Sequence, residues 1–190
     1  VPPTIPLVED SHVYPENFRD AHVIKPKNDG SSFGVVIVES NNNSPPVRSH
    51  WAPDTNLMCE PFIPGRELTV SVLDGTALCV TEITSERDFY DFDAKYAPGG
   101  SKHILPANIP EKVSLKACLW AENAYRKLGC RGVIRADYRW NHKTNQLFML
   151  EVNTQPGMTA TSLVPEQARF VGMSGEELVN HLLEIAQCDD

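Results

Sequence analysis

Residues 133–140 read VIRADYRW and residues 147–153 read LFMLEVN, and these two stretches decide the fold of the chain. Both alternate apolar with polar residues, which is the pattern of half-buried β-strands. The polar segment Asn141–Gln146 lies between them and has the composition of a turn. We therefore expect a β-hairpin. Side chains alternate along its first strand, so that Arg135, Asp137 and Arg139 share one face, and the other face carries Ile134, Ala136, Tyr138 and Trp140.

The second strand adds polar residues to the same face of the hairpin. Glu151 and Asn153 share one side of that strand. The other side carries its apolar residues, Phe148, Leu150 and Val152. Folding the hairpin about residues 143–144 brings Asp137 near Glu151 and Arg135 near Asn153.

Asp137, Glu151 and Asn153 thus present three oxygen donors on one polar face. Two carboxylates and an amide oxygen are hard ligands that suit Mg²⁺ or Mn²⁺, with phosphate oxygens completing an octahedron. The same spacing is also compatible with an exposed sheet face that carries a cross-strand ion pair. Local periodicity does not say which face of the hairpin is buried, so both interpretations stay open at this point.

The surrounding sequence predicts a second hairpin and a long helix. Residues 68–73 and 77–83 flank Asp74-Gly75, which is a strong hairpin signal. Residues 111–128 predict a helix that ends at Gly129. Its expected apolar face consists of neighbouring alanines together with Leu115, Cys118, Leu119 and Leu128.

A last helix is predicted to begin at Ser174, because Glu177 three residues later completes a capping box. Its apolar residues are Leu178, Val179, Leu182 and Leu183. Runs of paired strands with separate helices indicate the α+β class with largely antiparallel sheets.

The N-terminal third carries a candidate phosphate-binding loop. Strand-like stretches at residues 23–26 and 33–39 enclose the turn-forming residues 27–32. Backbone N–H groups of such a loop can cradle phosphates, although a plain hairpin turn has the same composition. It is not a Walker A loop, because no Gly-Lys-Ser/Thr follows and the next element is a strand.

Two further segments are typical of a hinge and a lid. A short strand is predicted over residues 57–62, and Pro64-Gly65-Arg66 follows it as a candidate hinge between two lobes. Residues 86–103 combine aromatic and charged side chains with Pro98-Gly99-Gly100, a pattern that favours a functional loop or lid.

The composition argues against several classes of partner. A formal net charge of -8 and a pI of about 5.2 do not attract phosphate backbones, so we expect no nucleic-acid partner. No apolar run approaches the roughly 20 residues that a membrane helix needs, so we expect no membrane partner. The five cysteines are an odd number without a C-x-x-C pair, which favours reduced thiols in a cytoplasmic protein.

Taken together, several stretches resemble the D-alanine–D-alanine ligases of the ATP-grasp superfamily. The matching stretches are residues 24–26 with 29–34, 60–70, 89–96, 135–137, 151–159 and 162–165. They follow the family's order and spacing, and residues 89–96 and 151–165 are the most specific. The resemblance implies an ATP-grasp fold, in which two α+β lobes with largely antiparallel sheets sandwich the nucleotide. Residues 1–64 would belong to the central lobe, and residues 65–190, with the lid loop 86–103, to the C-terminal lobe.

The resemblance also implies a role for each matching residue. Lys25 would contact the ATP phosphates, Glu60 the adenine, Glu67 the ribose and Lys95 the γ-phosphate. Further nucleotide contacts would come from Ser32, Pro61, Phe62 and Ile63. Two Mg²⁺ ions, or Mn²⁺, would be held by Asp137, Glu151 and Asn153. The implied catalytic positions are Ser31, Tyr96, Arg135 and the backbone N–H of Gly157. The implied substrate-binding positions are Tyr90, Ser162 and Leu163.

The implied function is ATP-dependent ligation of two D-alanines through an acyl phosphate, for peptidoglycan precursor synthesis. We expect a cytoplasmic enzyme whose full-length form is a homodimer, with ATP and D-alanine as substrates. The family's N-terminal domain, which anchors the first D-alanine, has no counterpart in this sequence, so we expect the chain alone to be inactive. The alternatives are a D-alanine–D-lactate ligase, against which Tyr96 argues, and a fragment that only binds nucleotide.

Overall fold

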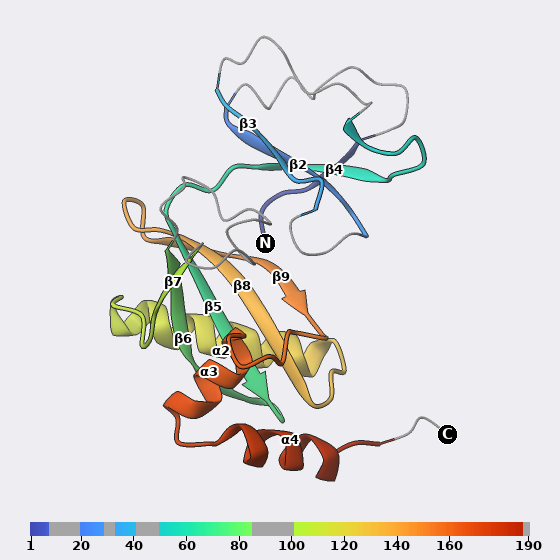
Figure 1. Cartoon of the computed structure of the whole chain (residues 1–190). Helices are drawn as coiled ribbons and strands as arrows, with labels where there is room; N and C mark the ends of the chain where they lie inside the picture. The colour runs from blue at the N-terminus through green and yellow to red at the C-terminus, as the bar shows by residue number, and fades with distance from the viewer. Residues whose placement is uncertain (8–19, 29–32, 41–49, 85–100, 188–190) are drawn as a thin grey trace. The chain divides into compact units, whose positions relative to one another are not determined.

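The structure is a computed structural model that describes residues 1–7, 20–28, 33–40, 50–84 and 101–187, with the side chains of residues 5–7 left out. The chain divides into two compact units (Figure 1). The first contains the described residues up to Pro64, and the second those from Gly65 to Thr84 and from Lys102 onward.

The first unit is built on a four-stranded antiparallel sheet. Its strands are β1 (Ile5–Leu7), β2 (His22–Pro26), β3 (Val36–Val38) and β4 (Leu57–Pro61), in the order β1-β4-β2-β3. Residues of β2, β3 and β4 form a small core together with Trp51: Ile24, Val38, Leu57 and Cys59. Strand β3 is shorter than the predicted strand at 33–39, because the chain turns at Phe33 and Gly34.

The second unit is built on a five-stranded antiparallel sheet in the order β7-β6-β5-β8-β9. The strands are β5 (Arg66–Leu73), β6 (Thr76–Thr84), β7 (Lys102–Ile104), β8 (Val133–Asn141) and β9 (Gln146–Asn153). Both predicted hairpins are present, β5 with β6 and β8 with β9. The prediction of an α+β class with largely antiparallel sheets is confirmed.

Helix α2 (Glu111–Lys127) covers one face of this sheet (Figure 1). Its buried residues recur at a spacing of four and face the strands: Val113, Ala117, Ala121 and Tyr125. The prediction of the apolar face was wrong for its three leucines, Leu115, Leu119 and Leu128, which are exposed. Leu115 lies two positions from Val113, about 200° around the helix, and so points away from the sheet. The alanines occupy the contact with the sheet, where their small side chains let the helix lie close to it.

The opposite face of the sheet is partly covered by α3 (Leu163–Phe170), and α3 packs against α4 (Gly175–Glu184). The small core on this side contains Leu73, Val164, Ala168 and Leu178. The predicted capping box at Ser174 and Glu177 is confirmed. Two residues of the predicted apolar face of α4, Val179 and Leu183, are exposed.

Part of the predicted lid is a strand. Lys102 and His103, at its C-terminal end, belong to β7 and pair with β6. Residues 86–100 of the predicted lid lie outside the described residues. Among the described residues, no helix is both long and apolar enough to cross a bilayer.

The cysteines that the structure describes are free thiols, as expected for a reduced protein. Cys59, Cys79 and Cys118 are largely withdrawn from solvent, and burial raises the pKa of the Cys59 thiol to about 11 and of the Cys79 thiol to about 12. These protonated thiols pack as small apolar side chains.

Replacing Gly65 by alanine is expected to destabilise the second unit by about 3–5 kcal/mol. Gly65 has a φ of +126°, and an added Cβ would lie 2.2 Å from the Trp140 carbonyl oxygen, which is fixed in β8. Urea unfolding followed by tryptophan fluorescence measures the change. Gly172→Ala is the matched control, since Gly172 also has a positive φ, +92°, but nothing lies within 4 Å of its added Cβ. Equal losses of stability in the two variants would contradict the steric argument.

Candidate functional site

The register of β8 and β9 brings the predicted polar residues together on one face of the sheet. Asp137 pairs with Glu151, and Arg135 pairs with Asn153. The predicted cross-strand neighbours are therefore confirmed. This face is opposite to the one that α2 covers, because the intervening residues Ala136 and Val152 pack into the core beneath α2.

One face assignment in β9 was wrong. The register shifts between Asp137 and Tyr138, and Leu150 is the extra residue of a β-bulge. Beyond the bulge, Phe148 pairs with Arg139 and so lies on the polar face, whereas Leu147 and Met149 turn toward the core. A bulge reverses the alternation of a strand, and strict period-two counting cannot detect it.

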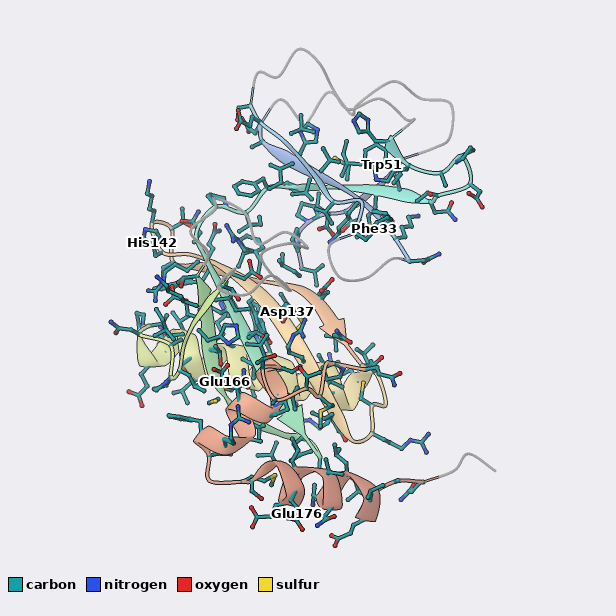
Figure 2. All side chains as sticks on the ribbon, in the orientation of Figure 1. Phe33, Trp51, Asp137, His142, Glu166 and Glu176 are labelled. Carbon is teal, nitrogen blue, oxygen red and sulfur yellow. The ribbon has the colours of Figure 1, made fainter. Side chains whose placement is uncertain are left out.

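Asp137, which Figure 2 labels, is held by three hydrogen bonds on this face. Arg135 donates two parallel hydrogen bonds to its carboxylate, from Nε to Oδ1 at 2.9 Å and from Nη2 to Oδ2 at 2.7 Å. Thr69 of β5 donates from its hydroxyl to Oδ1 at 2.7 Å. Asp137 is only 9% exposed, so these bonds are weakly screened by water and fix the direction of the carboxylate.

The other two candidate ligands are more accessible. Glu151 is exposed, and the amide oxygen of Asn153 accepts a hydrogen bond of 3.0 Å from the backbone N–H of Gln155. The set of one buried carboxylate, one exposed carboxylate and one amide oxygen fits the oxygen preference of Mg²⁺ or Mn²⁺. Among the described residues, no three His, Cys, Asp or Glu side chains gather as a metal site.

Glu67 lies on the same face, at the N-terminal end of β5. It pairs in register with Arg139 of β8, and its carboxylate lies 3.6 Å from the Arg139 guanidinium. Burial lowers the pKa of Arg139, and the neighbouring Glu67 carboxylate acts in the opposite direction by stabilising the charged guanidinium. The pair holds Glu67 in place beside the Thr69–Asp137 pair of the same two strands.

Gly157 and Ser162 lie in close contact in the segment that leads into α3. A Cβ on Gly157 would lie 2.8 Å from the Ser162 hydroxyl oxygen, so a larger residue there would displace the Ser162 side chain. The Ser162 hydroxyl oxygen also accepts a hydrogen bond from the Thr159 backbone N–H at 3.1 Å. Ser162 is the N-cap of α3 and Leu163 its first residue, which places both at the positive end of the helix dipole.

In the first unit, the structure brings Lys25 and Glu60 together. Both face away from the core, because Ile24 and Cys59 beside them face into it. Lys25 Nζ lies 2.8 Å from Glu60 Oε2, and the Thr4 hydroxyl donates to Glu60 Oε1 at 3.0 Å. Glu60 is buried, so the Lys25 ammonium balances its charge.

Residues 61–63, which were predicted to contact the nucleotide, come directly after Glu60 in the chain. Pro61 ends β4, and the backbone N–H of Phe62 donates to the Ala21 carbonyl oxygen at 2.9 Å, which ties the segment that contains Ile63 to the start of β2. The remaining predicted site residues lie outside the described residues: Ser31, Ser32, Tyr90, Lys95 and Tyr96.

Sequence reasoning missed three residues that hold this face together: Thr69, Arg139 as the partner of Glu67, and Gln167. Alternation along β5 places Thr69 on the same face as Glu67, so Thr69 could have been found from the predicted hairpin. Gln167 could not have been found in this way, because its importance depends on contacts with strands about a hundred residues earlier.

Comparison with known proteins gives a consistent result. A protein-family model described as the C-terminus of D-ala D-ala ligase matches residues 11–184. The D-alanine–D-alanine ligase of Paramagnetospirillum magneticum is 52% identical over 180 residues, which cover 92% of this chain and 58% of the relative. The ligase of Rhodospirillum rubrum is 54% identical over 169 residues, which cover 88% of this chain and 55% of the relative. The chain therefore spans somewhat more than half the length of these relatives.

Solved structures share the fold. The D-alanine–D-alanine ligase of Bacillus anthracis complexed with ATP has a TM-score of 0.77 at 22% identity, over 97% of this chain and 59% of that one. The VanG D-Ala:D-Ser ligase of Enterococcus faecalis has a TM-score of 0.75 at 27% identity, over 97% of this chain and 56% of that one. The expected ATP-grasp fold is thereby confirmed.

Proposed function

This chain belongs to the D-alanine–D-alanine ligase family through its match to the family's C-terminal part, and we propose that it is the ATP-binding and catalytic part of an enzyme that joins two D-alanines. The observation that carries the proposal is the pairing of Asp137 with Glu151 and of Arg135 with Asn153 on one sheet face. That arrangement combines oxygen donors suited to divalent metal ions, which phosphoryl transfer uses, with a guanidinium that can stabilise an oxyanion.

We propose nucleotide contacts for the Lys25–Glu60 pair of the first unit and for Glu67 of the second. In the first unit, Lys25 would contact the phosphates, and Glu60 with the backbone of residues 61–63 would bind the adenine. Lys25 and Glu60 are already held by each other and by Thr4, so neither has to be ordered when ATP binds. In the second unit, Glu67 would accept the ribose hydroxyls, with Arg139 holding its carboxylate in position.

We propose that Asp137, Glu151 and Asn153 hold two Mg²⁺ ions, or Mn²⁺, against the phosphates. Bound divalent ions neutralise the charge on the transferred phosphoryl group and align it with the attacking carboxylate. The contribution of the chain is the orientation of its oxygens, above all that of the nearly buried Asp137 carboxylate.

The ligation step would use the neighbouring residues. The carboxylate of the first D-alanine attacks the γ-phosphate and releases ADP, which gives an acyl phosphate. The amine of the second D-alanine then attacks the acyl carbon and displaces phosphate. Arg135 and the Gly157 N–H would stabilise the oxyanion that forms. The start of α3, at Ser162 and Leu163, would bind the carboxylate of the second D-alanine at the positive end of the helix dipole.

The test is a chimera in which the part of the Paramagnetospirillum ligase that this chain does not match is joined to the N-terminus of this chain. We expect ADP release that depends on D-alanine and on Mg²⁺, with D-alanyl-D-alanine as the product by chromatography. The complete relative is the positive control, and excess EDTA should stop both ADP release and synthesis. Absence of ADP release from a folded chimera that binds ATP would contradict the proposal.

The same assay separates the alternatives for the second substrate. The likeness to a D-Ala:D-Ser ligase makes D-serine a candidate beside D-lactate. We expect D-alanine to give the largest kcat/KM of the three. A larger kcat/KM with D-lactate or D-serine would leave the proposed reaction class unchanged and would show that the second substrate is not D-alanine.

A further inference from the structure

A β-bulge in β6, opposite the central strand β5 of the second unit, creates a binding position for one side chain of α3. The register between β5 and β6 shifts between Val70 and Val72, so that two residues of β6, Leu78 and Cys79, lie opposite the single residue Ser71, which has no register partner in β6. The Ser71 backbone N–H instead donates to Gln167 Oε1 at 2.9 Å. The Gln167 amide oxygen thus serves as the hydrogen-bond acceptor for the Ser71 N–H, where a regular ladder would use a backbone carbonyl oxygen of a neighbouring strand.

Gln167 is fully buried, and both its amide oxygen and its amide nitrogen make hydrogen bonds. Besides accepting from Ser71, its Nε2 donates to the Thr69 carbonyl oxygen at 3.3 Å and to the Thr81 hydroxyl at 3.0 Å. A buried amide with these partners is rigid, because breaking any of the bonds inside the protein leaves a polar group without a partner. α3 is therefore fixed to β5 and β6 by a specific polar contact as well as by its apolar residues.

Thr69 connects this anchor to the candidate metal ligand. Its carbonyl oxygen accepts from Gln167, and its hydroxyl donates to Asp137 Oδ1 at 2.7 Å. Thr69 is fully buried, so water cannot replace the hydroxyl. Oδ1 of Asp137 accepts from both Thr69 and Arg135 Nε, whereas Oδ2 accepts from Arg135 Nη2. A carboxylate oxygen has two lone-pair positions. Among the described contacts, both positions of Oδ1 are used, and Oδ2 has one position left for a metal ion.

We propose that Thr69 and Gln167 are positioning residues, which hold the metal ligand Asp137 and the first turn of α3 in one hydrogen-bonded unit. The inference rests on the proposed function of Asp137 and of Ser162 and Leu163. Gln167 lies one turn after Leu163, so the contact that anchors α3 also sets the position of its first turn. The distance between the metal ligand and the binding position of the second D-alanine is thereby fixed within the second unit.

The first test measures metal binding by the 190-residue chain. Mn²⁺ is titrated in the presence of a non-hydrolysable ATP analogue, and free Mn²⁺ is followed by electron paramagnetic resonance. Thr69→Val keeps the shape of the side chain but removes the donor, and we expect it to weaken Mn²⁺ binding by about 10–100-fold, as loss of a ligand's hydrogen-bond partner does in other metal sites. Thr69→Ser retains the hydroxyl and should bind Mn²⁺ nearly as wild type does.

Thr81→Val is the matched control. Thr81 is the cross-strand neighbour of Thr69 and equally buried, but its hydroxyl bonds to Gln167 and has no described contact with Asp137. Its loss of Mn²⁺ affinity should be much smaller than that of Thr69→Val, because it removes no hydrogen bond to Asp137 itself. Wild-type affinity in Thr69→Val, or equal losses in Thr69→Val and Thr81→Val, overturns the role of Thr69. If Thr69→Val does not fold, as judged by circular dichroism, Thr69→Ala takes its place with the same outcomes.

Different results would contradict the proposed metal site and the proposed role of Thr69. If wild type binds Mn²⁺ no better than Asp137→Ala does, the proposed metal site is wrong, whatever Thr69 does. If wild type binds Mn²⁺ and Asp137→Ala does not, the site stands, and the Thr69 variants test the inference alone.

The second test uses Gln167→Met in the chimera at a temperature well below its unfolding transition. Removal of the amide frees the first turn of α3, so the KM for the second D-alanine should rise by roughly tenfold or more while the KM for ATP stays unchanged. General loosening of the fold would raise both KM values together. That result, or an unchanged KM for D-alanine, overturns the role of Gln167.

Discussion

Replacing Asp137 by alanine is expected to lower the kcat of the chimera by about 10³-fold or more. Three hydrogen bonds hold the Asp137 carboxylate, and its removal also leaves the Arg135 guanidinium and the Thr69 hydroxyl without their common partner. The metal ions would lose a ligand and the phosphoryl group its neutralising charge. ADP release and dipeptide formation should fall together, because both depend on the same phosphoryl transfer.

Asp54→Ala is the control for this variant. Asp54 is an exposed carboxylate in the first unit, so its removal changes the net charge by the same amount without touching the candidate site. We expect its kcat to be close to that of the unmodified chimera. Thermal unfolding of both variants separates loss of activity from loss of fold. An Asp137→Ala chimera that is folded and retains most of its turnover would show that phosphoryl transfer does not depend on this carboxylate.

The 190-residue chain alone is expected to bind Mg²⁺ and ATP but to make D-alanyl-D-alanine many orders of magnitude more slowly than the chimera. The resemblance assigns the anchors of the first D-alanine to a part of the family's proteins that this chain does not match. Positioning of two reactants contributes up to about 7–11 kcal/mol to such a reaction, which corresponds to five or more powers of ten in rate. The nucleotide contacts proposed for Lys25, Glu60 and Glu67 are all within the chain, so ATP binding should be reduced much less.

Isothermal titration with ATP and a coupled ADP-release assay with D-alanine measure the two properties on the same sample. Adding the unmatched part of the relative as a covalent fusion should restore synthesis without a comparable gain in ATP affinity. Turnover by the chain alone at the rate of the complete relative would contradict the assignment of the first D-alanine site.

Much of the candidate site was predictable because its residues lie on neighbouring strands of one hairpin. Period-two alternation is sufficient to place Asp137 with Arg135 on one face of β8 and Glu151 with Asn153 on one face of β9. The exact pairing of Asp137 with Glu151 depends in addition on the bulge at Leu150, which alternation does not reveal. The roles of Lys25, Glu60 and Glu67 came from resemblance to a family, since single charged residues carry no such information. The pairing of Lys25 with Glu60 became visible only when β2 and β4, separated by some thirty residues, were placed side by side.

The sequence by itself determined the features that depend on local periodicity and local backbone chemistry. These are the two hairpins, the turn at Asp74-Gly75, the capping box at Ser174 and the antiparallel α+β class. Each depends on residues within a few positions of one another, where hydrogen-bonding geometry and side-chain alternation follow directly from the order of residues.

Only the tertiary structure decided which faces are buried and which polar groups meet across the sheet. The exposed side of α2 carries its large leucines, because the sheet accepts the alanine face. The bulge at Leu150 moves Phe148 to the polar face, and the bulge of β6 opposite Ser71 admits Gln167. The hydrogen bond from Thr69 to Asp137 joins residues 68 positions apart. Such contacts result from competition among many packing arrangements, and their free energies depend on burial, which is a property of the assembled fold and not of any local segment.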